Sequence, residues 1–338
     1  MNGALIALDT WAGRDAAALM LDGRLEDVMI APPQDVPVLG TVFVGVAERP
    51  LKGTGGQFVR LPGGLKGFLK GNAPQGRRLA VQVNGFAEPG KAIPITTRLV
   101  LKSAAAIITP GAPSRSVARS IKGKAGDELK SFAARLDLPE GVGVIIRSAA
   151  LVATPEQITK QVAALVEDLS KIDPLPDKPT LLVPGRTPRT WSETEWSPDA
   201  IIDPNPNSFD RHAVRDALEA VLTGETALPS GGSVVIEATR ALVAVDVNSG
   251  GAHGGAQGLT ATLEALADLP RLLRLRGLGG QITIDCAPFG KAHRRTVEQR
   301  IAKAFGTDSV ESNFAGWTPL GHIELTRKRE RFPTPHEG

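Results

Sequence analysis

The chain has 338 residues, 22% of them charged and 42% hydrophobic, with a formal net charge of +3. This length exceeds what one compact core usually needs, so we expect two or three domains, and the composition excludes wholesale disorder. Apolar runs stop well short of the roughly 18 residues of a membrane span, and the first residues lack the basic start of a signal peptide. We therefore expect a cytoplasmic protein. The single cysteine, Cys286, excludes an internal disulfide and a Cys-x-x-Cys zinc clip.

The first half of the chain alternates short β-rich stretches with turn residues. Residues 4–33 predict three strands, the last two joined by a hairpin at Asp22 and Gly23. Residues 38–102 hold five short strand-like stretches separated by Gly and Pro, which is typical of a small barrel such as an OB-fold. Residues 104–171 predict strand, helix, strand and helix, a separate α+β module. The Pro-rich residues 173–227 predict a connector that ends in a helix over 212–222.

The last third of the chain predicts an α/β domain. Residues 230–250 indicate two strands joined by a tight turn, followed by an apolar-periodic helix from about residue 259 and a strand over 281–287. A strand, crossover helix and strand in this order imply a parallel pair. A basic helix and a last strand follow. Pro270 falls in the crossover helix, where it would cost about 3 kcal/mol unless the helix restarts there.

Two carboxylates lie at the ends of the predicted parallel strands. Asp246 ends one strand and Asp285 ends the next, and the carboxyl edge of such strands is where α/β sheets bind ligands. Carboxylates a few ångströms apart repel each other and therefore favour a hard cation such as Mg²⁺. Asn248 points to the same side of its strand and could hydrogen-bond a carboxylate or a metal-bound water. The alternative is that both aspartates merely end strands and bond loop amides.

Other polar and aromatic residues suggest contacts with nucleic acid. Phe58 and Phe68 on two barrel strands could stack bases beside Lys91, or they could fill the barrel core. Arg147 and Ser148 follow an apolar strand and suit a phosphate, although a surface salt bridge is the ordinary alternative for such an arginine.

Positive charge is locally dense in the domain that holds the two aspartates. The basic stretches are residues 271–277, 291–300 and 326–331, and such clustering suits a polyanionic substrate. The middle stretch also reads as a solvated helix face, because Glu298 and Gln299 interrupt it.

The sequence resembles the ribonuclease E/G family of bacterial endoribonucleases. The resemblance rests mainly on three segments: LPSGGSVVIEATRALVAVDVNSGG at 228–251, LEALADLPRLLRLRGLGGQITID at 263–285 and LGHIELTRKR at 320–329. Further matches upstream are DGRLEDVMI, FVRLPGGLKGFL, KAIPITT and LPEGVGVIIRSA. The resemblance covers nearly the whole chain, with residues 175–210 as the weak part.

The resemblance implies a multi-domain α/β fold. An RNase H-like part would comprise residues 1–35 and a shortened second segment, residues 176–226. Between these lie an OB-fold RNA-binding barrel over residues 36–102 and a 5′-sensor-like α/β module over 103–175. A DNase I-like α/β catalytic domain would follow over residues 227–332.

The resemblance also implies the activity and its residues. Asp246 and Asp285 would bind Mg²⁺ with support from Asn248, and the chain would hydrolyse single-stranded RNA to 5′-phosphate and 3′-hydroxyl ends. The residues expected to contact RNA are Phe58, Phe68, Lys91, Arg119, Arg147, Ser148, Arg276, Arg327, Lys328 and Arg329. Among these, Arg147 and Ser148 take the place of the family's Arg-Thr pair that reads a 5′ monophosphate.

Several positions depart from the family pattern. The usual D-F-I-D-M segment is here Asp285-Cys286-Ala287-Pro288-Phe289, and Thr262 replaces an asparagine. These changes favour an alternative, a catalytically weak RNA-binding or regulatory relative; DNA as the target is a third alternative that nothing in the sequence demands. The zinc-link Cys-x-x-Cys and the small domain are absent, so a zinc-link tetramer is not expected, while a homodimer through the catalytic domain stays open.

Overall fold

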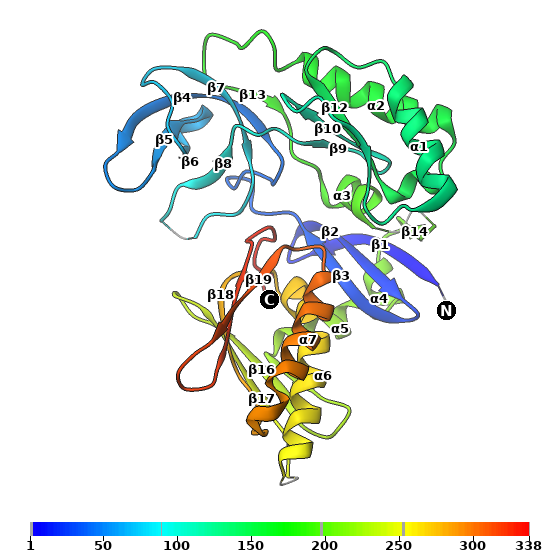
Figure 1. Cartoon of the computed structure of the whole chain (residues 1–338), viewed down its shortest axis with the longest axis vertical. Helices are drawn as coiled ribbons and strands as arrows, with labels where there is room; N and C mark the ends of the chain where they lie inside the picture. The colour runs from blue at the N-terminus through cyan, green and yellow to red at the C-terminus, as the bar shows by residue number, and fades with distance from the viewer. Residues whose placement is uncertain (1–2, 89, 197–198, 252–253, 338) are drawn as a thin grey trace. The chain divides into compact units, whose positions relative to one another are not determined.

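The chain forms two compact units. The computed structural model describes residues 3–88, 90–196, 199–251 and 254–337 (Figure 1). Unit 1 comprises Met1–Ile30 and Ile202–Gly338, and unit 2 comprises the intervening Ala31–Ile201. Unit 2 is therefore inserted between two segments of unit 1. In the described part of the chain, each helix is too short or too polar to cross a membrane.

The N-terminal segment of unit 1 is the predicted three-stranded meander. Strands β1 (Ala4–Trp11), β2 (Arg14–Leu21) and β3 (Arg24–Ile30) pair antiparallel, and β14 (Ile201–Asp203) completes the sheet in the order β14-β1-β2-β3. The two hairpin turns place Ala12, Gly13, Asp22 and Gly23 at positive φ, as tight turns between antiparallel strands require. Helices α4 (Ser208–Arg211) and α5 (Val214–Leu222) follow β14.

A six-stranded sheet forms the C-terminal part of unit 1. The strands are β15 (Glu225–Ala227), β16 (Ser233–Ala238), β17 (Val243–Asn248), β18 (Gly280–Asp285), β19 (Ser312–Trp317) and β20 (Ile323–Arg327), in the order β15-β16-β17-β18-β20-β19. As predicted, β17 and β18 pair parallel, and the long helix α6 (Gly255–Leu275) connects them. Strand β19 was not predicted.

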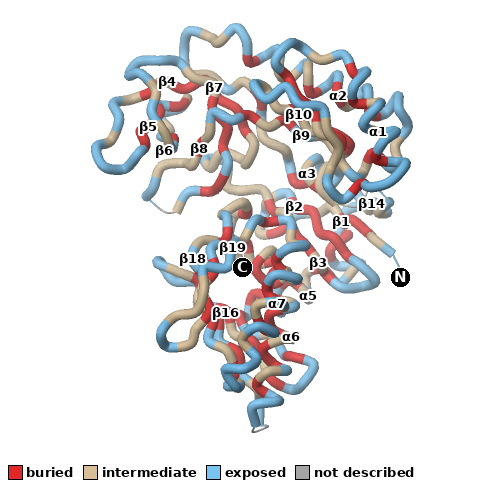
Figure 2. Tube along the Cα trace, in the orientation of Figure 1, coloured by how far each residue is buried: buried red, intermediate tan, exposed pale blue. Residues whose placement is uncertain are grey.

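One face of this sheet is buried under helices and the opposite face carries polar residues. Along β17 the side chains alternate, with Val243, Val245 and Val247 buried and Asp246 exposed. Figure 2 shows buried and exposed positions along the chain of unit 1. The buried set belongs to one hydrophobic core with side chains of α6 and of α7 (Arg294–Gly306). Because strand side chains alternate between faces, Asp246 lies on the face away from this core.

Helix α6 continues through Pro270 and does not restart there. Leu266, Leu269 and Leu273 are almost completely buried in the core of unit 1. This packing outweighs the hydrogen bond that proline cannot donate, since most helical stability in proteins comes from the buried face.

Unit 2 contains a closed five-stranded barrel. Its strands are β4 (Val42–Leu51), β5 (Gly56–Arg60), β6 (Lys66–Lys70), β7 (Arg78–Val83) and β8 (Ile93–Thr96), in the order β4-β5-β6-β8-β7, with β7 pairing back to β4. The prediction of five barrel strands is confirmed. Its interior is filled by Phe43, Val59, Leu61, Leu69, Val81, Val83 and Ile95.

The rest of unit 2 is a mixed α/β module. Strands β9 (Leu101–Lys102), β10 (Ala106–Pro110), β11 (Arg115–Val117) and β12 (Val142–Ile146) form a sheet in the order β11-β12-β10-β9, accompanied by helices α1 (Gly123–Arg135) and α2 (Pro155–Ser170). The connector contains more structure than expected, since β13 (Thr180–Val183) pairs with β4 and α3 (Pro188–Glu195) follows. The change from unit 2 to unit 1 thus falls inside the segment 176–226.

Candidate functional site

Asp246 and Asp285 are direct neighbours on adjacent parallel strands. In the register of β17 and β18, Val245 is opposite Ile284 and Asp246 is opposite Asp285. Val245 and Ile284 are buried in the core, so both carboxylates lie on the polar face of the sheet, where both residues are exposed. The crossover from strand to helix to strand therefore brings together two residues that are far apart in the sequence.

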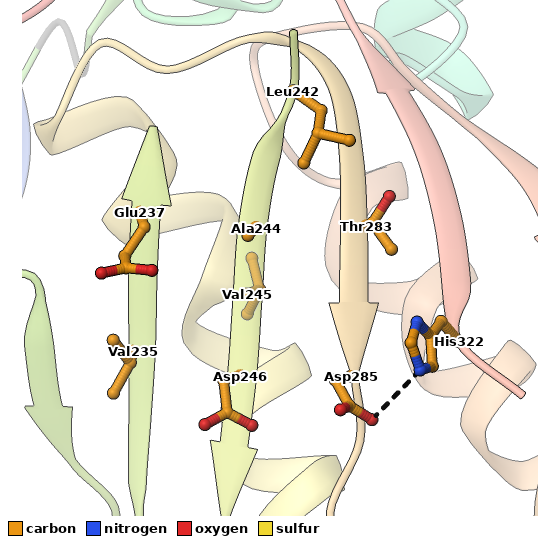
Figure 3. A pocket seen from close by; sticks show the side chains of 9 residues that line it. All are labelled: Val235, Glu237, Leu242, Ala244, Val245, Asp246, Thr283, Asp285 and His322. Atoms are coloured by element: carbon orange, nitrogen blue, oxygen red, sulfur yellow. Dashed lines mark ion pairs between the residues drawn. The ribbon is translucent and has the colours of Figure 1, made fainter. Parts of the chain in front are cut away.

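The carboxylates border an open cavity of about 250 Å³ (Figure 3). Its lining side chains come from four strands or their ends and are those of Val235, Glu237, Leu242, Ala244, Val245, Asp246, Thr283, Asp285 and His322. The side-chain amide of Asn248 donates a hydrogen bond of 2.9 Å to Asp246 Oδ2. This bond orients the Asp246 carboxylate, as the sequence predicted for Asn248.

His322 is a member of this site that the sequence analysis missed. Its Nε2 lies 3.7 Å from Asp285 Oδ1, and the side chain is about one-third exposed. The antiparallel register of β18 and β20 explains the approach, because Ile284 is opposite Ile323 and the preceding His322 therefore comes level with Asp285. Only the pairing of β20 with β18, which has no local sequence signal, could have revealed it.

The two carboxylates suit a hard cation that binds few protein ligands and keeps water in its other coordination positions. Within the ranges that the structure describes, no group of three or more His, Cys, Asp or Glu side chains could hold a metal. Mg²⁺ commonly binds through one or two carboxylates and completes its octahedron with water and substrate phosphates. Two exposed carboxylates at adjacent positions therefore fit Mg²⁺ better than a metal that demands a complete cage of protein ligands.

The barrel carries a half-buried aromatic pair. Phe58 of β5 is opposite Phe68 of β6, and their rings meet edge to face with centroids 6.2 Å apart. Both rings are half-buried and lie outside the barrel core, so the core-filling alternative is not supported. Lys66 Nζ lies 5.7 Å from the centre of the Phe58 ring. Lys91 is largely exposed in the loop between β7 and β8, where it forms an ion pair with Glu88.

Comparisons with known proteins relate this chain to one family. Residues 197–330 match the model of the Ribonuclease E/G family. Over these residues the chain is similar to the ribonuclease E/G family. Ribonuclease E of Haemophilus influenzae is 28% identical over 297 residues, which cover 75% of this chain and 32% of that relative. Ribonuclease G of Salmonella typhimurium is 26% identical over 380 residues, covering 93% of this chain and 77% of the relative. The chain thus spans about a third of the length of that ribonuclease E.

The loop after Asp285, where the chain departs from the ribonuclease E/G pattern, is anchored on α6. Thr262 is fully buried, and its hydroxyl lies 3.5 Å from the Ala287 carbonyl. Gly258 approaches Pro288 so closely that a β-carbon at residue 258 would overlap the proline carbonyl. Burial and the nearby Asp285 raise the pKa of the Cys286 thiol to about 12, so the thiol is protonated at neutral pH.

Arg327 and Arg276, both expected to contact RNA, bond to groups of the chain itself. The Arg327 side chain is 1% exposed and is paired with the buried Asp308. Arg276 donates to the Ile236 carbonyl, and burial lowers its pKa. The Arg327 charge is thus not presented to solvent in the way that a phosphate contact requires, and its predicted RNA contact is corrected. Arg276 is only partly buried, and its contact with RNA stays a prediction.

The remaining basic candidates differ in their surroundings. Arg119 is exposed, and so is Lys328, which forms ion pairs with Glu311 and Glu330. Arg329 packs its guanidinium over Gly280 at the start of β18. Ser148 is exposed at the start of a short 3-10 turn. Arg147 is held by acceptors of unit 2: its Nη1 donates to the carbonyls of Ser103 and Thr194, and its Nη2 donates to Glu195 at 2.6 Å.

Proposed function

We propose that this chain is a Mg²⁺-dependent endoribonuclease that hydrolyses single-stranded RNA and leaves 5′-phosphate and 3′-hydroxyl ends. The observation that carries the proposal is the register of β17 and β18, which sets Asp246 beside Asp285 on an exposed sheet face. Both residues lie within the segment that matches the ribonuclease E/G model. The names of the relatives, ribonuclease E and ribonuclease G, support the reaction class.

Each residue of the site has a distinct role in this proposal. Asp246 and Asp285 would hold the cation through carboxylate oxygens, and Asn248 fixes the rotamer of Asp246 by occupying its Oδ2. A bound Mg²⁺ supplies positive charge to the scissile phosphate and lowers the pKa of a coordinated water. Thr283 and Ala244 lie two residues before the two aspartates on the same strands. Their short side chains line the cavity and leave room for a phosphate group.

The barrel supplies the second part of the proposal, the binding of the RNA strand. Exposed aromatic rings stack with bases regardless of sequence, and the Phe58–Phe68 pair provides such a surface. Lys91 and Arg119, together with Lys328 and Arg329 of unit 1, would contact phosphates. Affinity should then fall steeply as salt increases, because each phosphate contact releases counterions.

The proposal is tested by incubating the purified chain with single-stranded RNA, with and without Mg²⁺. We expect metal-dependent cuts, and at least a ~100-fold lower rate for Asp246→Asn, since loss of about 3 kcal/mol of transition-state stabilisation corresponds to that factor. Asp216→Asn is the matched control, because Asp216 is exposed on α5 and outside the site. Equal cutting by Asp246→Asn and the unsubstituted chain would refute the proposed active site.

A catalytically weak RNA-binding relative is the second candidate. It is favoured by the segment after Asp285, where Cys286, Ala287, Pro288 and Phe289 supply no further carboxylate. Tight RNA binding without Mg²⁺-dependent cuts, unchanged in Asp246→Asn, would support this candidate. Equal cutting of a DNA strand of the same sequence would instead indicate a nuclease that does not distinguish the sugar.

A further inference from the structure

Three basic side chains of unit 2 converge on one carboxylate. Glu195, at the end of α3, accepts from Arg147 Nη2 at 2.6 Å and from Arg186 Nη1 at 2.8 Å, each through a different oxygen. Lys102 Nζ lies 4.0 Å from the same carboxylate. The Glu195 side chain is 16% exposed, so this cluster is largely shielded from water.

The cluster resembles an anion-binding site in which the Glu195 carboxylate takes the place of the anion. Two guanidinium groups bound to separate oxygens of one group, with an ammonium nearby, are an arrangement that recognises a carboxylate or a phosphate. Arg147 is further held by two backbone carbonyls, of Ser103 at 2.7 Å and of Thr194 at 2.9 Å. Its donors are therefore committed to acceptors of the chain itself.

The local sequence places Glu195 in this position. Thr187 caps the N-terminus of α3: its hydroxyl accepts a hydrogen bond from the Thr190 amide. Pro188 occupies the first helical position. Burial raises the pKa of Glu195, but the positive charges of Lys102, Arg147 and Arg186 outweigh it, so the net shift is downward. The carboxylate is consequently ionised at neutral pH and is held next to Arg147 by the fold.

We propose that Glu195 is a specificity-determining residue that occupies the place at Arg147 where a 5′-terminal phosphate of RNA would bind. The inference rests on the proposed function, since it concerns the RNA that this chain would select. A terminal phosphate would have to displace a tethered carboxylate that is already buried among its partners, and separating such a pair leaves uncompensated charge. RNA with a 5′ monophosphate and RNA with a 5′ hydroxyl are therefore bound equally well.

The test compares two versions of one single-stranded RNA, with a 5′ monophosphate and with a 5′ hydroxyl. The full chain carries Asp246→Asn throughout, so that cleavage does not disturb the binding measurement. We expect affinities within twofold of each other, and a preference of about tenfold for the monophosphate after Glu195→Gln, which frees Arg147 and Arg186. Glu193→Gln is the matched control, because Glu193 lies on the same helix and pairs only with the exposed Arg189 among the contacts described.

A second measurement works without RNA and separates this inference from the proposed function. Adenosine 5′-monophosphate should raise the melting temperature of Glu195→Gln and leave that of the unsubstituted chain unchanged. Failure of both RNAs to bind would refute the proposed function, while the nucleotide measurement would still test the role of Glu195.

Two results would overturn the inference. One is a fivefold or larger preference of the unsubstituted chain for the monophosphate. The other is a Glu195→Gln protein that is folded but shows neither the preference nor the nucleotide effect. If Glu195→Gln does not fold, Arg147→Ala provides the test. Under this inference, its affinity for each RNA stays within twofold of that of the unsubstituted chain. A selective loss of binding to the monophosphate RNA contradicts the inference.

Discussion

At the scale of single residues, the proposed function predicts that the half-buried rings of the barrel contribute little to stability and much to RNA binding. Phe58 and Phe68 pack against each other outside the barrel core, which is built around Val59, Leu61 and Leu69. Phe58→Ala should weaken binding of single-stranded RNA by roughly 5- to 100-fold, since stacking contributes about 1–3 kcal/mol per base. Fluorescence anisotropy with a labelled RNA measures this change.

The neighbouring Val59 supplies the control for that prediction. Val59 is fully buried, so Val59→Ala should lower the free energy of unfolding by about 2 kcal/mol through lost burial and a cavity. It should leave the half-buried Phe58–Phe68 pair in place. If Phe58→Ala costs more stability than Val59→Ala and leaves RNA affinity unchanged, the ring is a core residue and the binding role is wrong.

The raised pKa of the Cys286 thiol predicts how the stability of the chain depends on pH. The pKa of its thiol is raised to about 12, against about 9 for an exposed thiol, so the folded chain retains the proton over that interval while the unfolded chain loses it. Stability contributed by the protonated thiol is therefore complete below pH 9 and declines as pH rises towards 12. Alkylation by iodoacetamide at pH 8 should be at least ~100-fold slower in the folded chain than in urea. Equal rates in the two states would contradict the burial of this thiol.

Whether a site residue could be predicted from the sequence depends on whether a local pattern predicts the pairing of the segments that bring it into the site. Asp246 and Asp285 were predictable because a strand, helix and strand form a parallel pair of fixed handedness. His322 was not, because its approach to Asp285 follows from pairing between β18 and β20. Arg327 was misinterpreted because a basic residue in sequence does not show that the buried Asp308 lies beside it.

At the scale of elements, Pro270 shows that packing overrides helix propensity. The proline leaves the carbonyl one turn earlier without its helical donor, yet α6 runs unbroken from Gly255 to Leu275. Pro270→Ala should restore that bond and remove about 3 kcal/mol of strain, while losing two buried methylene groups worth about 0.8 kcal/mol each. The free energy of unfolding should rise by about 1 kcal/mol, as measured with urea. A decrease would show that the ring itself is essential to the core.

The elements that the sequence did not reveal are short and depend on distant partners. Strands β13 and β15 have four and three residues, and each pairs with a longer strand that supplies the ladder. Strand β19 includes Gly316 at a bulge and lacks a clear alternation of buried side chains. By contrast, the barrel strands and α6 carry strong local periodicity, which is why they were predicted.

At the scale of the whole molecule, the two units are built around separate hydrophobic cores. One core in unit 1 joins side chains of β1 to β3, α5, the six-stranded sheet, α6 and α7. This core contains side chains of residues 1–35 and of residues 227–332, which the sequence predicts to lie in separate domains. Such contacts span most of the chain, as when the Trp11 indole donates to the Pro335 carbonyl, and no local pattern predicts them.

A buried ion network lies within unit 1. Asp308, whose side chain is fully buried, pairs with Arg274 of α6 and Arg327 of β20. Arg274 also approaches Asp27 of β3 at 3.7 Å, and Arg331 donates to Asp27 at 2.8 Å. The network therefore connects the first segment of the chain with the last, through residues that the sequence separates by some three hundred positions.

Asp308→Ala should destabilise unit 1 and spare unit 2. Removing the carboxylate leaves Arg274 and Arg327 buried without their shared partner, which should cost about 3–5 kcal/mol. Hydrogen exchange followed by mass spectrometry should then show faster exchange in peptides from residues 202–337 and unchanged exchange in those from 31–196. Glu311→Gln, which removes an exposed ion pair with Lys328, should change stability by less than about 1 kcal/mol. Uniform acceleration across both units would instead mean that they unfold as one cooperative body, contrary to the separation of their cores.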